Sequence, residues 1–174
     1  MGLGKRYVVP FAGLKAGTHQ FEFEADEKFF KELKNAEVET GKVLVNLSLI
    51  KQSTMMILDF QIGGTFDVLC DRCAIPYGIP LKGRHQLIVK LGDEEQTGDD
   101  EVITLPFSES EIDLAPYINE YITLSLPARK VPCEILSDGT LCDLEMIEKL
   151  ENLKTKKDKP SDERWDKLKN IKLT

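Results

Sequence analysis

Two alternating runs separated by a short polar turn place the strongest constraint on the fold. Residues 43–50 and 55–62 are rich in Val, Leu, Ile and Met, and only four polar residues separate them. Aliphatic residues at a period of two are typical of half-buried strands. The sequence therefore predicts an antiparallel hairpin, followed by a second reversal at Gly63-Gly64 and by a short strand that leads into Cys70.

Segments on both sides of this hairpin extend it into an α+β fold. Alternating apolar residues predict further strands, whereas apolar residues three or four apart predict helices. Strands are expected over residues 6–14, 18–25, 77–91 and 102–105, and helices over residues 26–36, 111–127 and 143–153. Asp26 and Asp113 are the expected N-caps of the first two helices, because a carboxylate can accept the unpaired N–H groups of a first turn. We expect a mainly antiparallel, curved sheet with two or three packing helices.

Length and composition divide the chain into a body and a tail. With 174 residues, of which 41% are hydrophobic, one domain over residues 1–153 is expected. Residues 154–160 have the composition of a linker, and residues 161–171 place Trp165 on the apolar face of a short amphipathic helix. A helix this short is marginal alone, so its apolar face is expected to dock on the body or on a partner. Residues 154–174 are thus a basic C-terminal extension.

Charge is unevenly distributed along the chain. The formal net charge of −7 argues against wholesale binding to nucleic acid or to anionic membranes. From Lys149 to the C-terminus, nine Lys and Arg stand against five Asp and Glu, a local charge of +4, so residues 1–148 carry −11. Residues 92–101 contain six acidic side chains among ten and predict a solvated loop, since the spacing of a calcium-binding loop is absent. Such a chain can bind one partner with its tail while the body repels others.

The distribution of apolar residues excludes a membrane span. No apolar run approaches the eighteen or more residues needed to cross a bilayer, so no membrane partner is expected. The first residues also lack the apolar segment of a secretory signal, which favours a cytoplasmic protein. In that reducing compartment the cysteines are expected to remain thiols rather than to form disulfides.

The cysteines are the strongest candidates for a functional site. Cys70 and Cys73 are separated by two residues, and two thiolates at this spacing in a tight turn can point at one metal ion. Cys133 and Cys142, the other two cysteines, would complete four ligands, although the eight residues between them require an open loop. The sequence therefore predicts a structural zinc site that would tether the long loop over residues 128–140.

Two other interpretations of the cysteine pair remain open at this point. Thioredoxin-like redox chemistry would place the pair at the start of a helix, but residues 74–80 contain two prolines and a glycine, which disfavour a long helix. Alternatively, the cysteines are ordinary reduced thiols that pack beside a hairpin as small apolar side chains.

Four features in a fixed order resemble the YceD family, the large ribosomal RNA subunit accumulation proteins. They are Cys70-Asp-Arg-Cys73 followed by Tyr77, the acidic loop, the apolar pattern from Ile112 to Pro127, and a terminal Asp-x-Arg-Trp-x-x-Leu-Lys. The resemblance covers about residues 40–172. It implies a cytosolic bacterial protein that supports accumulation or maturation of large-subunit rRNA by binding that rRNA or a precursor particle.

An RNA-binding surface needs local positive charge and benefits from an aromatic ring on which bases can stack. Basic residues lie beside the first cysteine pair, ahead of the third cysteine and in the tail, where a tryptophan accompanies them. The candidate RNA-binding residues are Arg72, Lys82, Arg84, Arg129, Lys130, Lys156, Lys157, Lys159 and Trp165.

Catalysis is not expected from this sequence. It contains two isolated histidines and no nucleophile elbow, phosphate loop or metal-hydrolase motif. A second hypothesis is a protein–protein assembly factor whose acidic loop and terminal helix bind a basic ribosomal protein, with RNA touched indirectly. A thiol redox enzyme is the third hypothesis.

Overall fold

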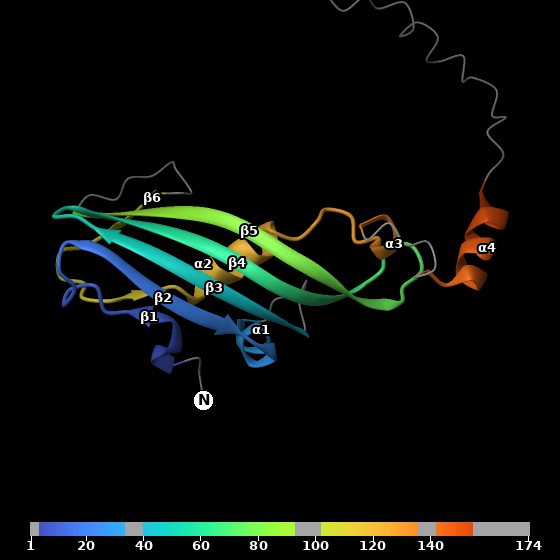
Figure 1. Ribbon diagram of the computed structural model, residues 1–174, viewed down its shortest axis with the longest axis horizontal. Helices are drawn as coiled ribbons and strands as arrows, with labels where there is room; N and C mark the ends of the chain where they lie inside the picture. Colours follow the sequence, from blue (N-terminus) through green and yellow to red (C-terminus); the bar gives the residue numbers. More distant parts are fainter. Residues whose placement is uncertain (1–3, 34–39, 93–101, 136–141, 155–174) are drawn as a thin grey trace, which may run out of the picture.

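A mainly antiparallel sheet forms the centre of an α+β structure (Figure 1). The computed structural model describes residues 4–33, 40–92, 102–135 and 142–154. The sheet has the order β2-β3-β4-β5-β6. Its strands are β2 (Gly17–Ala25), β3 (Thr40–Lys51), β4 (Met55–Leu69), β5 (Pro76–Leu91) and β6 (Val102–Leu105). The first four strands pair antiparallel and β6 joins β5 in parallel, which confirms the expected fold class.

The sheet has a buried face and an outer face. Along β4, the side chains of Met56, Leu58 and Phe60 are buried, and the residues between them point to the opposite side. The same alternation in β3 and β5 adds aliphatic side chains to the buried face. One face therefore carries the core, and the other carries mainly polar and half-buried side chains, with Leu44 and Leu69 exposed on it.

Short elements cover the buried face. They are η1 (Gly4–Tyr7), β1 (Val8–Val9), α1 (Glu27–Leu33), β7 (Ile112–Asp113) and α2 (Ala115–Leu124), while α3 (Pro132–Ile135) and α4 (Leu144–Leu153) lie near one end of the molecule (Figure 1). Strands β1 and β7 form a separate antiparallel pair.

Aromatic rings join this layer to the sheet. The ring centroids of Phe30 of α1 and Phe66 of β4 are 5.5 Å apart, and those of Phe60 of β4 and Tyr121 of α2 are 5.1 Å apart. Large aromatic side chains contribute most to a core of this kind because each buries a large apolar area. The two helices are thereby fixed at different points along the same strand.

The C-terminal end of α2 is held against β5 by a polar contact. The ring of His85 stacks on that of Tyr121 at a centroid distance of 4.7 Å, and His85 Nε2 lies 2.8 Å from Ser125 Oγ. Ser125 is the C-cap of α2, and its hydroxyl donates to the carbonyl of Tyr121 at 2.6 Å. The helix thus ends where its last turn meets the sheet, three residues before Pro127, which was expected to stop it.

Local sequence signals predicted most of these elements. The hairpin of β3 and β4 is confirmed, and so is the cap of α1, where Asp26 Oδ1 accepts from the N–H groups of Lys28 and Phe29 at 3.1 Å. The predicted helix over residues 143–153 is confirmed as α4. The acidic loop beyond Gly92, the end of the first predicted helix and the basic extension from residue 155 onward lie outside the described residues.

Three local predictions were wrong. Gly63-Gly64 does not reverse the chain, because both glycines lie within the continuous strand β4. Asp113 is not the N-cap of α2; it is the last residue of β7, although its carboxylate still accepts the N–H of Ala115 at 2.9 Å. The expected strand over residues 6–14 is reduced to the two residues of β1, preceded by the 3₁₀ turn η1.

The role of Gly64 is close approach between two strands. A Cβ atom at Gly64 would lie 2.8 Å from Val43 Cα and still closer to the carbonyl oxygen of Lys42, both of which are backbone atoms that cannot rotate away. A Cβ atom at the neighbouring Gly63 would meet nothing within 4 Å. Substitution of Gly64 therefore tests this role, and the same substitution at Gly63 is the control.

We expect Gly64→Ala to lower the free energy of unfolding by about 1–3 kcal/mol, because the added methyl forces β3 and β4 apart. Gly63→Ala is expected to be neutral or to stabilise by up to about 1 kcal/mol, since alanine loses less backbone entropy on folding than glycine. Urea unfolding of both variants and of the parent measures the difference. Equal effects of the two substitutions would contradict the role assigned to Gly64.

Candidate metal centre at the end of the sheet

Strands β4 and β5 are joined at one end of the molecule by a tight turn that contains Cys70 and Cys73. The N–H of Cys70 donates to the carbonyl of Ile75 at 2.9 Å, and the N–H of Ala74 donates to the carbonyl of Cys70 at 2.8 Å. Ala74 has a φ of 58°, a left-handed conformation that costs energy for a residue with a Cβ. This unfavourable conformation occurs in the turn that brings the two cysteines together.

Hydrogen bonds join the turn to a segment that is distant in the sequence. The N–H of Asp71 donates to the carbonyl of Lys130 at 2.9 Å, and the N–H of Lys130 donates to Asp71 Oδ2 at 2.6 Å. These reciprocal bonds join the turn to the segment that leads into α3. Val131, the next residue, is buried in a small apolar cluster with the cysteines.

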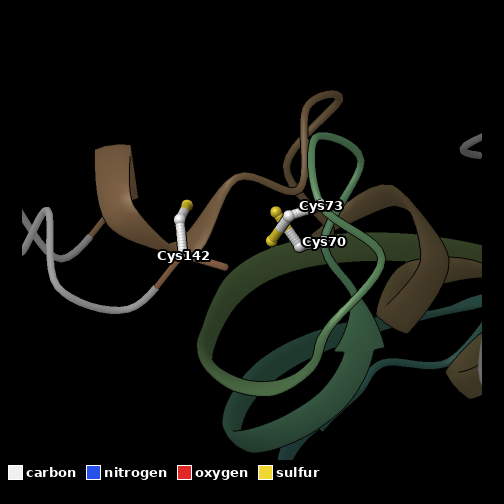
Figure 2. A group of neighbouring side chains, drawn as sticks. All are labelled: Cys70, Cys73 and Cys142. Atoms are coloured by element: carbon white, nitrogen blue, oxygen red, sulfur yellow. The ribbon is translucent and has the colours of Figure 1, made fainter. Parts of the chain in front are cut away.

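Three cysteine side chains meet in this cluster (Figure 2). The sulfur atoms of Cys70, Cys73 and Cys142 all lie within 4.8 Å of one another, and the three residues are buried. Figure 2 shows Cys70 and Cys73 on the turn between β4 and β5 and Cys142 on the segment just before α4. Three of the four predicted ligands are therefore brought together.

The fourth predicted ligand, Cys133, can be placed only by its backbone. It belongs to the single turn of α3, where the sequence predicted part of a long loop, and it follows Val131 of the cysteine cluster by two residues. The side chain of Cys133 lies outside what the structure describes. Its part in the cluster stays a prediction.

Backbone N–H groups point at two of the sulfur atoms. The N–H of Arg72 donates to Cys70 Sγ at 3.4 Å. The pKa of the Cys73 thiol is lowered, chiefly because the N–H of Asp143 donates to its sulfur, with further contributions from the N–H of Ile75 and from the thiols of Cys70 and Cys142. Burial opposes this shift but does not cancel it. Hydrogen bonds of this kind favour the charged thiolate.

The donor set fits a soft divalent metal ion. Thiolates are the preferred ligands of structural zinc, and two of them two residues apart in a tight turn match a common half-site. The apolar side chains that pack around the thiols are those of Val131, Ile75 and Ile147. A metal ion held by these three cysteines would join the turn to the segment that begins α4.

The predicted RNA-binding residues fall into two described groups. Arg72 and Lys130 lie beside the reciprocal hydrogen bonds of the turn, and Arg129 forms an ion pair of 3.0 Å with Glu134. Lys156, Lys157, Lys159 and Trp165 lie outside the described residues. Among the described candidates, these three residues near the turn form one group.

The second group lies on the outer face of the sheet. Lys82 and Arg84 are exposed residues of β5 that alternate with its buried residues, so they point away from the core. In the register of the sheet Lys82 stands opposite Gly63, and Arg84 stands opposite Gln61. Within the described ranges, no acidic side chain lies within salt-bridge distance of either cation. They are therefore available to an anionic partner.

Some features of this site had no signal in the sequence. The pairing of Asp71 with Lys130 joins residues far apart in the chain, and the N–H of Asp143 reaches Cys73 only because the start of α4 is folded against the turn. An aspartate between two cysteines and an aspartate directly after a cysteine are both common surface residues. Only the three-dimensional arrangement gives them their roles.

The fold and the cysteines define an α+β protein with a thiol cluster at the end of a long β-hairpin. Comparison with protein-family models matches residues 58–172 to the family described as large ribosomal RNA subunit accumulation protein YceD. The chain belongs to this YceD family, as the order of its motifs predicted, and its role accordingly lies in ribosome biogenesis. No curated protein and no solved structure matches the chain. None of the helices in the described ranges has the length and apolarity to span a bilayer.

In the metal-free protein we expect the free energy of unfolding to rise as the pH rises toward 9.0, the ordinary pKa of a thiol. Because the pKa of Cys73 is lower in the folded state, the unfolded state binds more protons in this window. The contribution is full above pH 9.0 and disappears as the pH falls through the folded pKa. Urea unfolding with a chelator at several pH values measures it, and a Cys73→Ser variant with the same pH dependence would contradict the assignment.

Proposed function

We propose that this protein supports accumulation or processing of bacterial large-subunit rRNA in the cytoplasm by binding that rRNA or a precursor particle, without catalysis. Membership of the YceD family carries the proposal. The placement of Lys82 and Arg84 on an open sheet face supports it, because two uncompensated cations on a rigid strand can contact phosphates without the cost of ordering a loop.

The metal centre has a structural role in this proposal. A zinc ion held by Cys70, Cys73, Cys142 and Cys133 would fix the turn of the hairpin against the segment before α3. Arg72 and Lys130 would then keep a defined position next to each other, since Asp71 between the two cysteines binds the backbone of Lys130. Zinc is not redox-active, so its role in this proposal would be structural. It would take the place of part of a hydrophobic core at this end of the sheet.

A histidine and a serine lie together between β5 and α2, and we assign them a structural role in this proposal. His85 Nε2 and Ser125 Oγ are 2.8 Å apart, but the serine hydroxyl donates its proton to the carbonyl of Tyr121. With the hydroxyl proton directed at that carbonyl, the serine oxygen is left to accept from the imidazole N–H. The pair is better explained as a contact that holds the end of α2 against β5.

We expect about one zinc ion per chain in protein purified without chelators, and serine substitution of Cys70, Cys73 or Cys142 should abolish its retention. Cys133→Ser should do the same if its side chain is the fourth ligand. Elemental analysis measures the metal, and thiol counting under native conditions measures protection of the cysteines. A native protein with no metal and with freely reactive thiols would contradict the zinc site.

For isolated large-subunit rRNA, we expect Lys82→Glu combined with Arg84→Glu to weaken binding by at least about tenfold. The slope of log affinity against log salt should decrease by about 0.7 for each phosphate that the variant no longer binds, as for single strands. Lys28→Glu combined with Lys31→Glu on α1 is the control with the same change in charge. Filter binding over a salt series measures both pairs.

The same experiment separates direct from indirect contact. If purified precursor particles bind the protein but isolated rRNA does not, the direct RNA contact is wrong and a ribosomal protein mediates the association. If neither binds, the proposed function is wrong.

A further inference from the structure

A row of polar side chains crosses three neighbouring strands on the outer face of the sheet. In the register of the sheet, Asn46 of β3 stands opposite Gln61 of β4, and Gln61 stands opposite Arg84 of β5. All three residues are exposed, and Figure 1 shows their strands side by side. Directly opposite residues have Cβ atoms about 5 Å apart, so two amides and a guanidinium group form one continuous row. We call Asn46, Gln61 and Arg84 the amide row.

The two ends of the row differ in charge. At the β5 end, Lys82 precedes Arg84 by two residues and points to the same side, about 7 Å away along the strand. Gly63 stands opposite Lys82, and a Cβ atom there would meet nothing within 4 Å, so the space beside the lysine is open. At the β2 end, Glu22 stands opposite Asn46. A phosphate is therefore attracted to the β5 end and repelled from the β2 end.

The amides of the row have unused hydrogen-bonding capacity. Within the described ranges, neither Asn46 nor Gln61 is hydrogen-bonded to another side chain. In the neighbouring row of the same face, by contrast, Gln86 donates to Asp59 at 2.8 Å. A side-chain amide both donates and accepts, so the amide row can serve a ligand group that does the same.

The outer face offers no ring on which a base could stack. The phenylalanine and tyrosine side chains of β2 to β5 all belong to the core or pack against it; they are Phe21, Phe23, Phe60, Phe66 and Tyr77. Stacking of unpaired bases on aromatic rings is the usual basis of single-strand recognition by a sheet. Among the described strands, this face is therefore suited to the backbone of a nucleic acid rather than to its bases.

The backbone of RNA carries the two groups that this surface can bind. The 2′-hydroxyl and the 3′ phosphate lie on neighbouring carbon atoms of the same ribose, and the hydroxyl is both a donor and an acceptor. A nucleotide whose phosphate is bound by Arg84 can thus direct its hydroxyl toward Gln61. DNA has the same phosphates but lacks the hydroxyl, so only RNA can satisfy both halves of the row.

We propose that the amide row, with Lys82 beside it, is a binding site for the ribose–phosphate backbone of RNA, in which the two cations bind phosphates and the two amides bind 2′-hydroxyl groups. The inference rests on the proposed function for RNA as the ligand. It adds that the site selects RNA over DNA and does so without reading the base sequence.

Binding of matched oligonucleotides to the full-length protein tests the selectivity. A single-stranded RNA of large-subunit rRNA sequence is compared with a 2′-deoxy oligonucleotide of the same sequence that carries uracil in place of thymine, so that only the hydroxyl groups differ. We expect the RNA to bind at least about fivefold more tightly, the effect of one or two neutral hydrogen bonds. A scrambled RNA of equal composition should bind within about twofold of the native sequence, because the bases are not read. Equal affinity for RNA and deoxy oligonucleotide would overturn the inference, and so would a clear preference for the native sequence.

Substitution assigns the selectivity to the amides. Asn46→Ala combined with Gln61→Ala should reduce the affinity for RNA to about that for the deoxy oligonucleotide, and it should leave the salt dependence unchanged because no charge is removed. Gln20→Ala combined with Gln52→Ala is the control, since it removes two exposed amides outside the row and should leave the preference for RNA within about twofold. Thermal unfolding of both double variants should match that of the parent, as all four side chains are exposed. Full retention of the preference for RNA in the first variant would contradict the role of the amides.

The outcomes separate this inference from the proposed function. If the parent binds RNA and the deoxy oligonucleotide equally, the row does not select ribose and the proposed function stands. If the parent binds neither oligonucleotide, the inference is wrong, and binding to purified precursor particles then decides the proposed function.

Discussion

The pairing of β4 with β5 is the interaction on which the rest of the structure depends. Fifteen consecutive residue pairs join the two strands, from Met55 opposite Lys90 to Leu69 opposite Pro76. One half of this long ladder supplies the middle of the sheet and buries the apolar side chains that α1 and α2 cover. The other half carries the chain outward to the cysteines. A shift of one residue in the register would turn the buried set outward and would also separate Cys70 from the segment it contacts.

Local patterns made the hairpin of β3 and β4 predictable, whereas nonlocal contacts made the rest unpredictable. The alternation in residues 43–50 and 55–62 gave the correct hairpin because burial on one face imposes a period of two. Gly63-Gly64 was assigned to a turn because glycine serves both turns and close strand approach, and only the neighbouring strand distinguishes them. The N-cap of α2 is Leu114 and not the predicted Asp113, because Asp113 belongs to β7. The pairing of β7 with β1 is a contact that no local pattern reveals.

The candidate site shows the same division. The spacing of Cys70 and Cys73 predicted a half-site, and the small number of cysteines pointed to Cys142 as a partner. The bond from Asp71 to Lys130 and the bond from Asp143 to Cys73 could not be predicted, since each joins two ordinary residues across a large sequence separation. Of the basic candidates that the structure describes, Lys82, Arg84 and Arg129 are exposed and Arg72 and Lys130 are half-buried. Their division between the turn and the outer sheet face depends on strand direction, which only the fold supplies.

The cysteine cluster joins two parts of the chain that emerge from the ribosome at different times. The sheet is complete once β6 ends at Leu105, whereas the cluster needs Cys142 and the first turn of α4. During synthesis the turn at Cys70 therefore exists for some time with its thiols solvated and without its partner segment. Closure of the cluster therefore requires residues that are synthesised late among the described elements, and it joins the end of the hairpin to the start of α4. A chain that stops before Cys142 would contain the strands of the sheet but not all the thiols of the cluster.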